Sequence, residues 1–391
     1  MPDLAPNKMD TFRAARFPAL AVYIICVFAG TFHGFLVMIG WTALGLAFIS
    51  WYVTPDRPKQ NPKVWVLLGV IVFSHLMAIP GSVWFGTGNW VLTASGVYWL
   101  VPGLVVFLIA DARVFQWLVA ITVIHATSIF VETWWYWGYI DMKPGAVADG
   151  LTFNPNVAAG FLIIGISMVF ATRRYWWTLF PLIIGLVFAN SRGALLVLCI
   201  VMVLLTLTRT LSLRRLIVVC VVIGIGTGIF GILHQQYHIA GYTSFSTDIF
   251  GAVIRDIGIR WAVPEWPDIY PHGVVEHLGL HNVPIRMARE AGIASAAGWL
   301  VLSAWALTRN RYTPAWWLML VIMLLSILDH YMWRVHLGSL WFLAAGILLV
   351  SHPSTQPTPS CVVNLVAPGL TPFLPPKHRL WRGDGPAQRY K

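Results

Sequence analysis

The stretch Phe17–Val53, FPALAVYIICVFAGTFHGFLVMIGWTALGLAFISWYV, decides the fold class. It is apolar throughout and holds no Asp, Glu, Lys or Arg. One helical crossing of a bilayer takes about 20 apolar residues, so this run is too long for a single span. Gly30 and Gly34 interrupt it near the middle, and glycine is a strong local breaker of regular structure. We therefore predict two short membrane spans joined by a tight turn.

The rest of the chain repeats this apolar character. Of its 391 residues, 58% are hydrophobic and 10% are charged, against roughly 45–50% and 25% in soluble proteins. Further apolar runs cover residues 64–79, 91–110, 114–131, 156–172, 176–189, 193–207, 216–233, 293–307, 314–328 and 335–350. Helices satisfy all their backbone groups internally, whereas barrels show short alternating segments. We predict an all-α integral membrane protein with about 12 transmembrane helices.

Basic residues gather in every second connection between these runs. The net charge of +11 therefore reflects membrane orientation, because Lys and Arg are retained on the cytoplasmic side, and no nucleic-acid partner is predicted. This assigns both termini to the cytoplasm and the intervening connections to the outer side. The predicted regions are a cytoplasmic N-terminus (1–16), spans (17–233), a large, partly helical outer loop (234–290), further spans (291–350) and a disordered cytoplasmic tail rich in Pro, Ser and Thr (351–391).

Two short polar motifs interrupt the apolar runs on the predicted outer side. The first is Phe153–Ala159, FNPNVAA. Apart from any functional role, this pattern is typical of a plain helix start, with Asn154 as cap and Pro155 in the first turn. The second is the break Asn190–Leu196, NSRGALL. Its arginine, Arg192, either extends to the lipid headgroups or joins the backbone N–H groups near Ser191 and Gly193 in an anion site suited to phosphate.

The large outer loop holds a third group of polar residues. Its basic and titratable members are Arg255, Arg260, His272, Glu276, His277, His281, Arg286 and Arg289. After Asn282 the segment is predicted to be helical, which places His281, Ile285 and Arg289 on one face. A neutral histidine beside arginines suits a general base, and a solvated loop histidine is the alternative.

A metal site is the rival interpretation of the loop histidines. His277 and His281 are spaced to chelate, but no cysteine or carboxylate completes a zinc set, and no metal or cofactor is predicted. The four cysteines show no metal spacing either. A fourth polar group, Asp329–His336, contains an Asp and an Arg and is a weaker candidate, since such a pair is often a structural clamp.

These motifs, in this order and with the long loop between the last two, resemble the O-antigen ligase and O-antigen polymerase superfamily of bacterial polytopic glycosyltransferases. The resemblance extends from about Leu151 to Leu300 and implies a GT-C-like fold. It implies that Arg192 and a loop arginine, matched to Arg260 with Arg255 as the alternative, bind a diphosphate. It also implies that His281 takes the proton of the acceptor hydroxyl, without a metal or a nucleotide-sugar donor.

The expected activity is transfer of a glycan from a polyprenyl (undecaprenyl) diphosphate to an acceptor sugar hydroxyl, at the periplasmic face of the bacterial inner membrane. We expect an O-antigen or polysaccharide polymerase. The first alternative is an O-antigen ligase acting on lipid A core, or an O-oligosaccharyltransferase. The second alternative is a lipid-linked glycan transporter. The expected partners are the lipid-linked glycan, the acceptor and the bilayer. Substrate-binding residues are expected at Arg255, Asn282, Arg289, Ser191 and Asn156.

Overall fold

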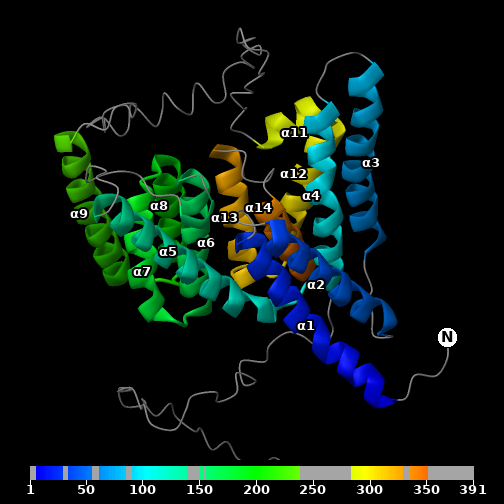
Figure 1. Cartoon of the computed structure of the whole chain (residues 1–391), viewed down its shortest axis with the longest axis horizontal. Helices are drawn as coiled ribbons and strands as arrows, with labels where there is room; N and C mark the ends of the chain where they lie inside the picture. The colour runs from blue at the N-terminus through cyan, green and yellow to red at the C-terminus, as the bar shows by residue number, and fades with distance from the viewer. Residues whose placement is uncertain are drawn as a thin grey trace, which may run out of the picture. The chain divides into compact units, whose positions relative to one another are not determined.

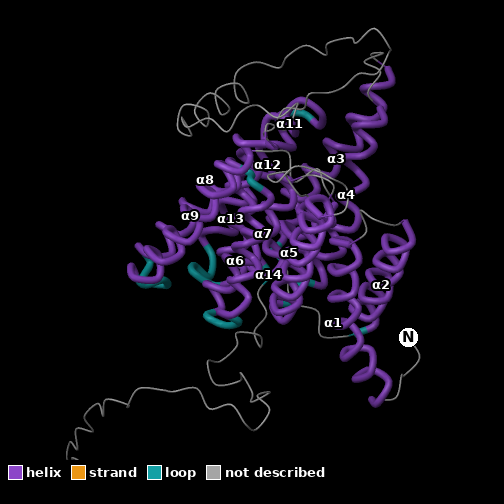
Figure 2. Tube along the Cα trace, turned by 60° about the vertical axis from the view of Figure 1, so that its left-hand side comes forward, coloured by secondary structure: helices purple, strands orange, loops and turns teal. Residues whose placement is uncertain are grey.

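The computed structural model describes residues 6–29, 34–54, 61–84, 90–138, 150–152, 155–237, 283–328 and 335–350, and all regular structure in them is helical (Figures 1 and 2). The α-helices are α1 (Pro6–Ala29), α2 (Gly34–Val53), α3 (Pro62–Trp84), α4 (Trp90–Ile109), α5 (Phe115–Gly138), α6 (Pro155–Thr172), α7 (Leu179–Ala189), α8 (Arg192–Leu207), α9 (Leu213–Tyr237), α11 (Val283–Ala291), α12 (Ile293–Thr308), α13 (Pro314–Leu328) and α14 (Val335–Leu349). Three short 3₁₀ helices are η1 (Ala112–Val114), η2 (Gly150–Thr152) and η3 (Trp176–Thr178).

The helices coincide with the predicted apolar runs. The first run is divided as expected, because α1 ends at Ala29 and α2 begins at Gly34. Three segments of the described residues are long and apolar enough to cross a membrane: Phe35–Val53, Pro62–Pro80 and Ala112–Trp135. The other apolar helical segments contain 10–17 residues. The described residues are thus all helical and three of their helices could cross a membrane, while twelve crossings remain a prediction.

The N-terminal and C-terminal helices pack against each other. Helix α1 lies on α2, α3 contacts α4 and α12, and α14 packs along α4. This last contact is close, since a Cβ added at Gly346 of α14 would lie 2.5 Å from the Phe107 carbonyl oxygen of α4. Small residues allow helices to approach in this way in membrane bundles. A second group contains α5–α9, and α13 joins the groups through contacts with α14, α6 and α8.

Aromatic side chains fill the contacts among the C-terminal helices. The rings of Trp299 and Trp341 are stacked with centroids 6.1 Å apart. The Trp341 Nε1–H donates to Ser303 Oγ at 2.9 Å, and Ser303 Oγ donates to the Trp299 carbonyl at 2.7 Å. These polar atoms in the core are thus paired, as a low-dielectric interior requires.

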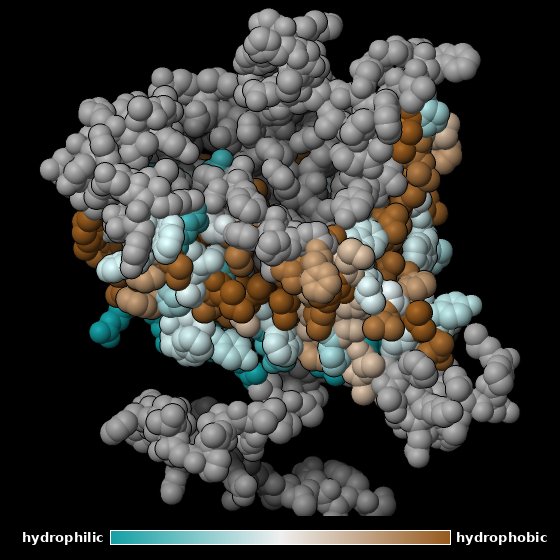
Figure 3. Space-filling view, viewed as in Figure 1, coloured by the Kyte–Doolittle hydropathy of each residue, from teal (hydrophilic) through white to brown (hydrophobic). Residues whose placement is uncertain are grey.

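The outer surfaces of the helices are apolar where a soluble protein would be polar. Large hydrophobic side chains such as Phe35, Phe73, Phe180 and Leu213 are exposed. Figure 3 shows a broad hydrophobic band over the described helices. An exposed apolar belt of this kind is stable only in contact with lipid or another apolar surface.

Several helices extend beyond their predicted limits: α3 continues to Trp84 and α5 continues to Gly138, inside the predicted outer connections. Helix α1 begins at Pro6, inside the N-terminal region 1–16, and α9 continues to Tyr237, inside the predicted loop. The end of that loop, 283–290, is helical in α11, as expected for the segment after Asn282. Residues 238–282 and the tail 351–391 lie outside the described residues.

Candidate functional site

The break between α7 and α8 is short and tightly capped. Asn190 ends α7 in the left-handed conformation (φ 43°, ψ 41°), and its N–H donates to the carbonyls of Leu186 and Val187, both at 3.2 Å. Asparagine tolerates this conformation better than most residues. Ser191 is the N-cap of α8, and its Oγ accepts from the Ala194 N–H at 3.4 Å. Two residues therefore separate the end of α7 at Ala189 from the start of α8 at Arg192.

Ser191 joins the two polar motifs that the sequence singled out. Its hydroxyl donates to Oδ1 of Asn156 at 2.7 Å, across 35 positions of sequence. Ser191 is buried, and Asn156 lies in the first turn of α6. Because this hydroxyl both caps α8 and donates to Asn156, its single proton is used within the protein. The contact fixes the start of α8 against the start of α6.

Arg192 is the first residue of α8, where the unpaired N–H groups of a helix and its positive dipole end favour an anion. Its side chain lies outside what the structure describes. Beside it, the side-chain oxygen of Asn190 is buried and has no hydrogen-bond partner among the described residues. A Cβ added at Gly193 would have no atom within 4 Å. The helix start thus combines donors, a buried acceptor and open space.

Helix α5 holds the connection that leads into the first motif. The Gly150 N–H donates to Oε2 of Glu132 at 2.5 Å, and the Leu151 N–H donates to Nδ1 of His125 at 3.3 Å. Gly150 has φ +55°, and an added Cβ would lie 2.7 Å from Ser128 Oγ. Glycine is required there by both conformation and space. Helix η2 is consequently held against α5 just before Pro155.

His125 has a hydrogen-bonding role that its sequence context does not reveal. It is 2% exposed, and its ring meets Phe161 edge to face with centroids 5.9 Å apart. Since Nδ1 accepts the Leu151 N–H, a neutral ring carries its proton on Nε2. That Nε2 is buried without a hydrogen-bond partner in the described part of the chain. His125 therefore both packs against Phe161 and positions η2.

The remaining predicted site residues belong to the large loop, which ends in α11. Arg289 lies in α11, which buries Val283 and Met287 and packs against α3 and α12. Helix α13 contacts α11 as well as α6 and α8, so it lies between the two groups of candidate residues. His281, Asn282, Arg255 and Arg260 are outside the described residues, as are residues 329–334 of the fourth polar group.

Sequence reasoning assigned no role to three side chains in or near the motifs: His125, Glu132 and Asn190. Glu132 offered a signal, as an acidic residue at the end of a long apolar run. Within the described ranges, no group of three or more His, Cys, Asp and Glu residues could hold a metal ion. The histidines of the rival zinc interpretation, His272, His277 and His281, lie outside those ranges.

The fully buried polar side chains of the described helices do not include the permanently charged types. The buried polar side chains are Ser, Thr and His, and no Asp, Glu, Lys or Arg occurs among those described. The charged side chains that the structure describes within helices are at most partly buried, as are Arg16 of α1 and Glu132 of α5. The chain matches no protein-family model, no curated protein sequence and no solved structure.

Proposed function

We propose that this protein is a metal-independent membrane glycosyltransferase that moves a glycan from a polyprenyl diphosphate to an acceptor hydroxyl at the periplasmic face of the bacterial inner membrane. The observation that carries the proposal is the 2.7 Å hydrogen bond from Ser191 to Asn156. It brings the two polar motifs of the sequence together at the helix start that bears Arg192. Polymerisation of an O-antigen or related polysaccharide is the preferred reaction, with ligation the alternative.

The chemistry assigned to the site is a displacement at the anomeric carbon. The acceptor oxygen forms a bond to that carbon while its bond to the diphosphate oxygen breaks. His281 takes the hydroxyl proton, and the diphosphate leaves with the bonding electron pair. Arg192 and Arg260 stabilise the negative charge that builds on the leaving group, and such stabilisation is stronger in a dry site than in water.

The geometry around the α8 start supports an anionic, hydroxyl-rich ligand. The free N–H groups of a first helical turn favour phosphate oxygens. The buried oxygen of Asn190 is an acceptor that a sugar hydroxyl can satisfy, which would recover roughly 1–3 kcal/mol of desolvation cost. Ser191 and Asn156 then act as positioning residues that hold the helix start in place.

A transporter of the same lipid-linked glycan is the rival function. Transporters carry ionisable residues at membrane depth along their path. The described buried side chains include no Asp, Glu, Lys or Arg. The two buried histidines, His75 and His125, hydrogen-bond to backbone groups of the fold, so these side chains favour the transferase.

Complementation distinguishes the reactions. The full chain is expressed in a polymerase-null strain and in a ligase-null strain, and the glycan ladder is read on a gel. Restored long chains in the first strain support the polymerase, and restored capped lipid A core in the second supports the ligase. Recovery in neither strain, with the protein present in the membrane, would contradict the catalytic proposal.

Two substitutions test the assigned roles. His281→Ala is expected to lower activity by about 10²–10⁴-fold, the usual contribution of a general base. Arg192→Ala should abolish the ladder, and Arg192→Lys should recover only part of it because lysine lacks the planar fork. Arg174→Ala is the matched control, as an exposed arginine of another connection. Full activity of either alanine variant would refute the role of that residue.

A further inference from the structure

Helices α3 and α12 leave a groove at one end of their contact. They run antiparallel, since Ser295 Oγ lies 3.2 Å from His75 Nδ1 and a Cβ added at Gly298 would lie 3.2 Å from Ile71. Towards the start of α3 and the end of α12, the contact opens into a groove of about 630 Å³. Its lining consists of Asn61, Lys63, Val66, Leu67, Val301, Trp305 and Arg309.

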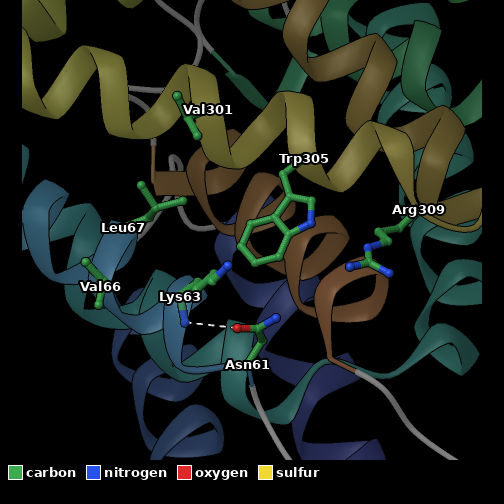
Figure 4. Close-up of a pocket in the computed structure, with 7 residues that line it drawn as sticks. All are labelled: Asn61, Lys63, Val66, Leu67, Val301, Trp305 and Arg309. Atoms are coloured by element: carbon green, nitrogen blue, oxygen red, sulfur yellow. Dashed lines mark hydrogen bonds between the residues drawn. The ribbon is translucent and has the colours of Figure 1, made fainter.

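The lining is polar at one end and apolar along the rest. Lys63 and Arg309 occupy the ends of α3 and α12, and the Arg309 guanidinium carbon lies 5.9 Å from the centre of the Trp305 ring. In Figure 4 the Trp305 ring lies between the two cationic side chains. The lining contains no acidic residue. Neither cation has an ion-pair partner in the described part of the chain.

The apolar part of the groove continues onto the outer surface of the helices. Val66 is 65% exposed and Val301 is 52% exposed. In a membrane these side chains face acyl chains, whereas the cations at the helix ends lie at the headgroup level. A ligand that fills the groove must therefore carry negative charge at one end and hydrocarbon along its length.

We propose that the groove binds an anionic phospholipid, with the phosphate between Lys63 and Arg309 and an acyl chain along Val66, Leu67 and Val301. The phospholipid comes from the leaflet on the side of the basic connections. Basic pockets between membrane helices on that side recognise such headgroups. The site uses none of the residues of the proposed transferase reaction, so it stands or falls separately.

Native mass spectrometry of the purified full chain tests the site. Phosphatidylglycerol is titrated into protein held in neutral detergent with phosphatidylcholine, and the apparent affinities are compared. The variant Lys63→Gln/Arg309→Gln should bind phosphatidylglycerol roughly 25-fold more weakly, since each basic residue near a membrane surface contributes roughly fivefold. The control Arg174→Gln/Arg214→Gln removes the same charge from exposed positions outside the groove and should bind as the wild type does.

Further variants and a competition experiment separate a phospholipid site from a site for a free anion. Val301→Trp keeps the charge of the groove and fills its apolar part, so it should weaken phosphatidylglycerol binding. Thermal unfolding verifies that each variant is folded. If the double variant Lys63→Gln/Arg309→Gln fails to fold, Val301→Trp and single Lys63→Gln carry the test. Excess inorganic phosphate should leave phosphatidylglycerol bound; displacement would identify a free-anion site and overturn the proposal. Equal affinity of both double variants, or unchanged binding by Val301→Trp, would also overturn it.

Discussion

At the scale of single residues, Ser191 is the position where local and long-range structure meet. Its hydroxyl caps α8 and donates to Asn156. Ser191→Ala should lower the free energy of unfolding by about 1–3 kcal/mol, because both the cap and the hydrogen bond to Asn156 are lost. Ser191→Thr keeps the hydroxyl and should remain close to the wild type. Thermal unfolding of the three proteins in one detergent measures the difference.

The relative stabilities of the three proteins test whether the Ser191 hydroxyl positions α8 by hydrogen bonding. If Ser191→Ala unfolds with the wild type, the hydroxyl contributes nothing to the junction of α6 and α8. If Ser191→Thr is as unstable as Ser191→Ala, the site depends on side-chain volume and not on hydrogen bonding. Both results would contradict a positioning role.

Residue-level prediction from the sequence worked where the signal is local. Pro155 begins α6, as expected from the preference of proline for the first helical turn. Ser191 and Asn156 were selected separately, but their contact spans 35 positions, and no local pattern encodes such a pairing. His125 shows the same limit more sharply. A single histidine in an apolar helix gives no sign that a backbone N–H 26 positions away will bond it.

At the scale of elements, the apolar runs predicted the helices well because the bilayer forces every backbone group into internal hydrogen bonds. The ends were less accurate. Helix α1 begins at Pro6 because helix propagation continues through residues with good helix propensity, such as Lys8 and Met9, beyond the apolar run. Apolar character sets the membrane portion of a helix and not its full length.

The connection between α4 and α5 is held by an ion pair whose strength depends on pH. Asp111 accepts from Arg113 Nη2 at 2.7 Å and from its Nε at 3.0 Å, and the Arg113 guanidinium lies over the Phe17 ring at 4.8 Å. Burial opposes ionisation of Asp111, but the hydrogen bonds from Arg113 outweigh it and lower the pKa of the carboxyl below 3.8.

This direction predicts how Asp111→Asn behaves. A lowered folded pKa stabilises the protein above the ordinary value of 3.8, and the contribution is lost as the pH falls through the folded value. The variant should be roughly 1 kcal/mol less stable near neutral pH, a modest figure because Arg113 is largely exposed. Thermal unfolding at neutral and strongly acidic pH measures the gap. A gap that persists or widens in acid would show that the carboxylate charge is not its cause.

At the scale of the whole molecule, the pairing of distant helices is what the sequence leaves open. Neighbouring runs such as α1 and α2 were expected to pack together, but α14 on α4 and α12 on α3 join opposite ends of the chain. Apolar faces in lipid are nearly interchangeable, so hydropathy does not select partners. Selection comes from close contacts such as Gly346 against Phe107, which depend on shape. The assembly of the candidate site could not be predicted from the sequence for the same reason, since α13 connects its parts only through tertiary packing.

Orientation in the membrane is the whole-molecule property on which both proposals depend. The basic connections, which include Arg173, Arg174, Arg309 and Arg311, are expected on the cytoplasmic side. Alkaline phosphatase needs disulfides and folds only outside the cytoplasm. Inserted between residues 238 and 282 it should be active, and fused after Lys391 it should be inactive. A fusion in the connection after α8, next to Arg209, is the control and should also be inactive. Activity at Lys391 and at Arg209, without activity in the loop, would reverse the orientation, placing the Arg192 helix start on the cytoplasmic side and the Lys63–Arg309 groove in the outer leaflet.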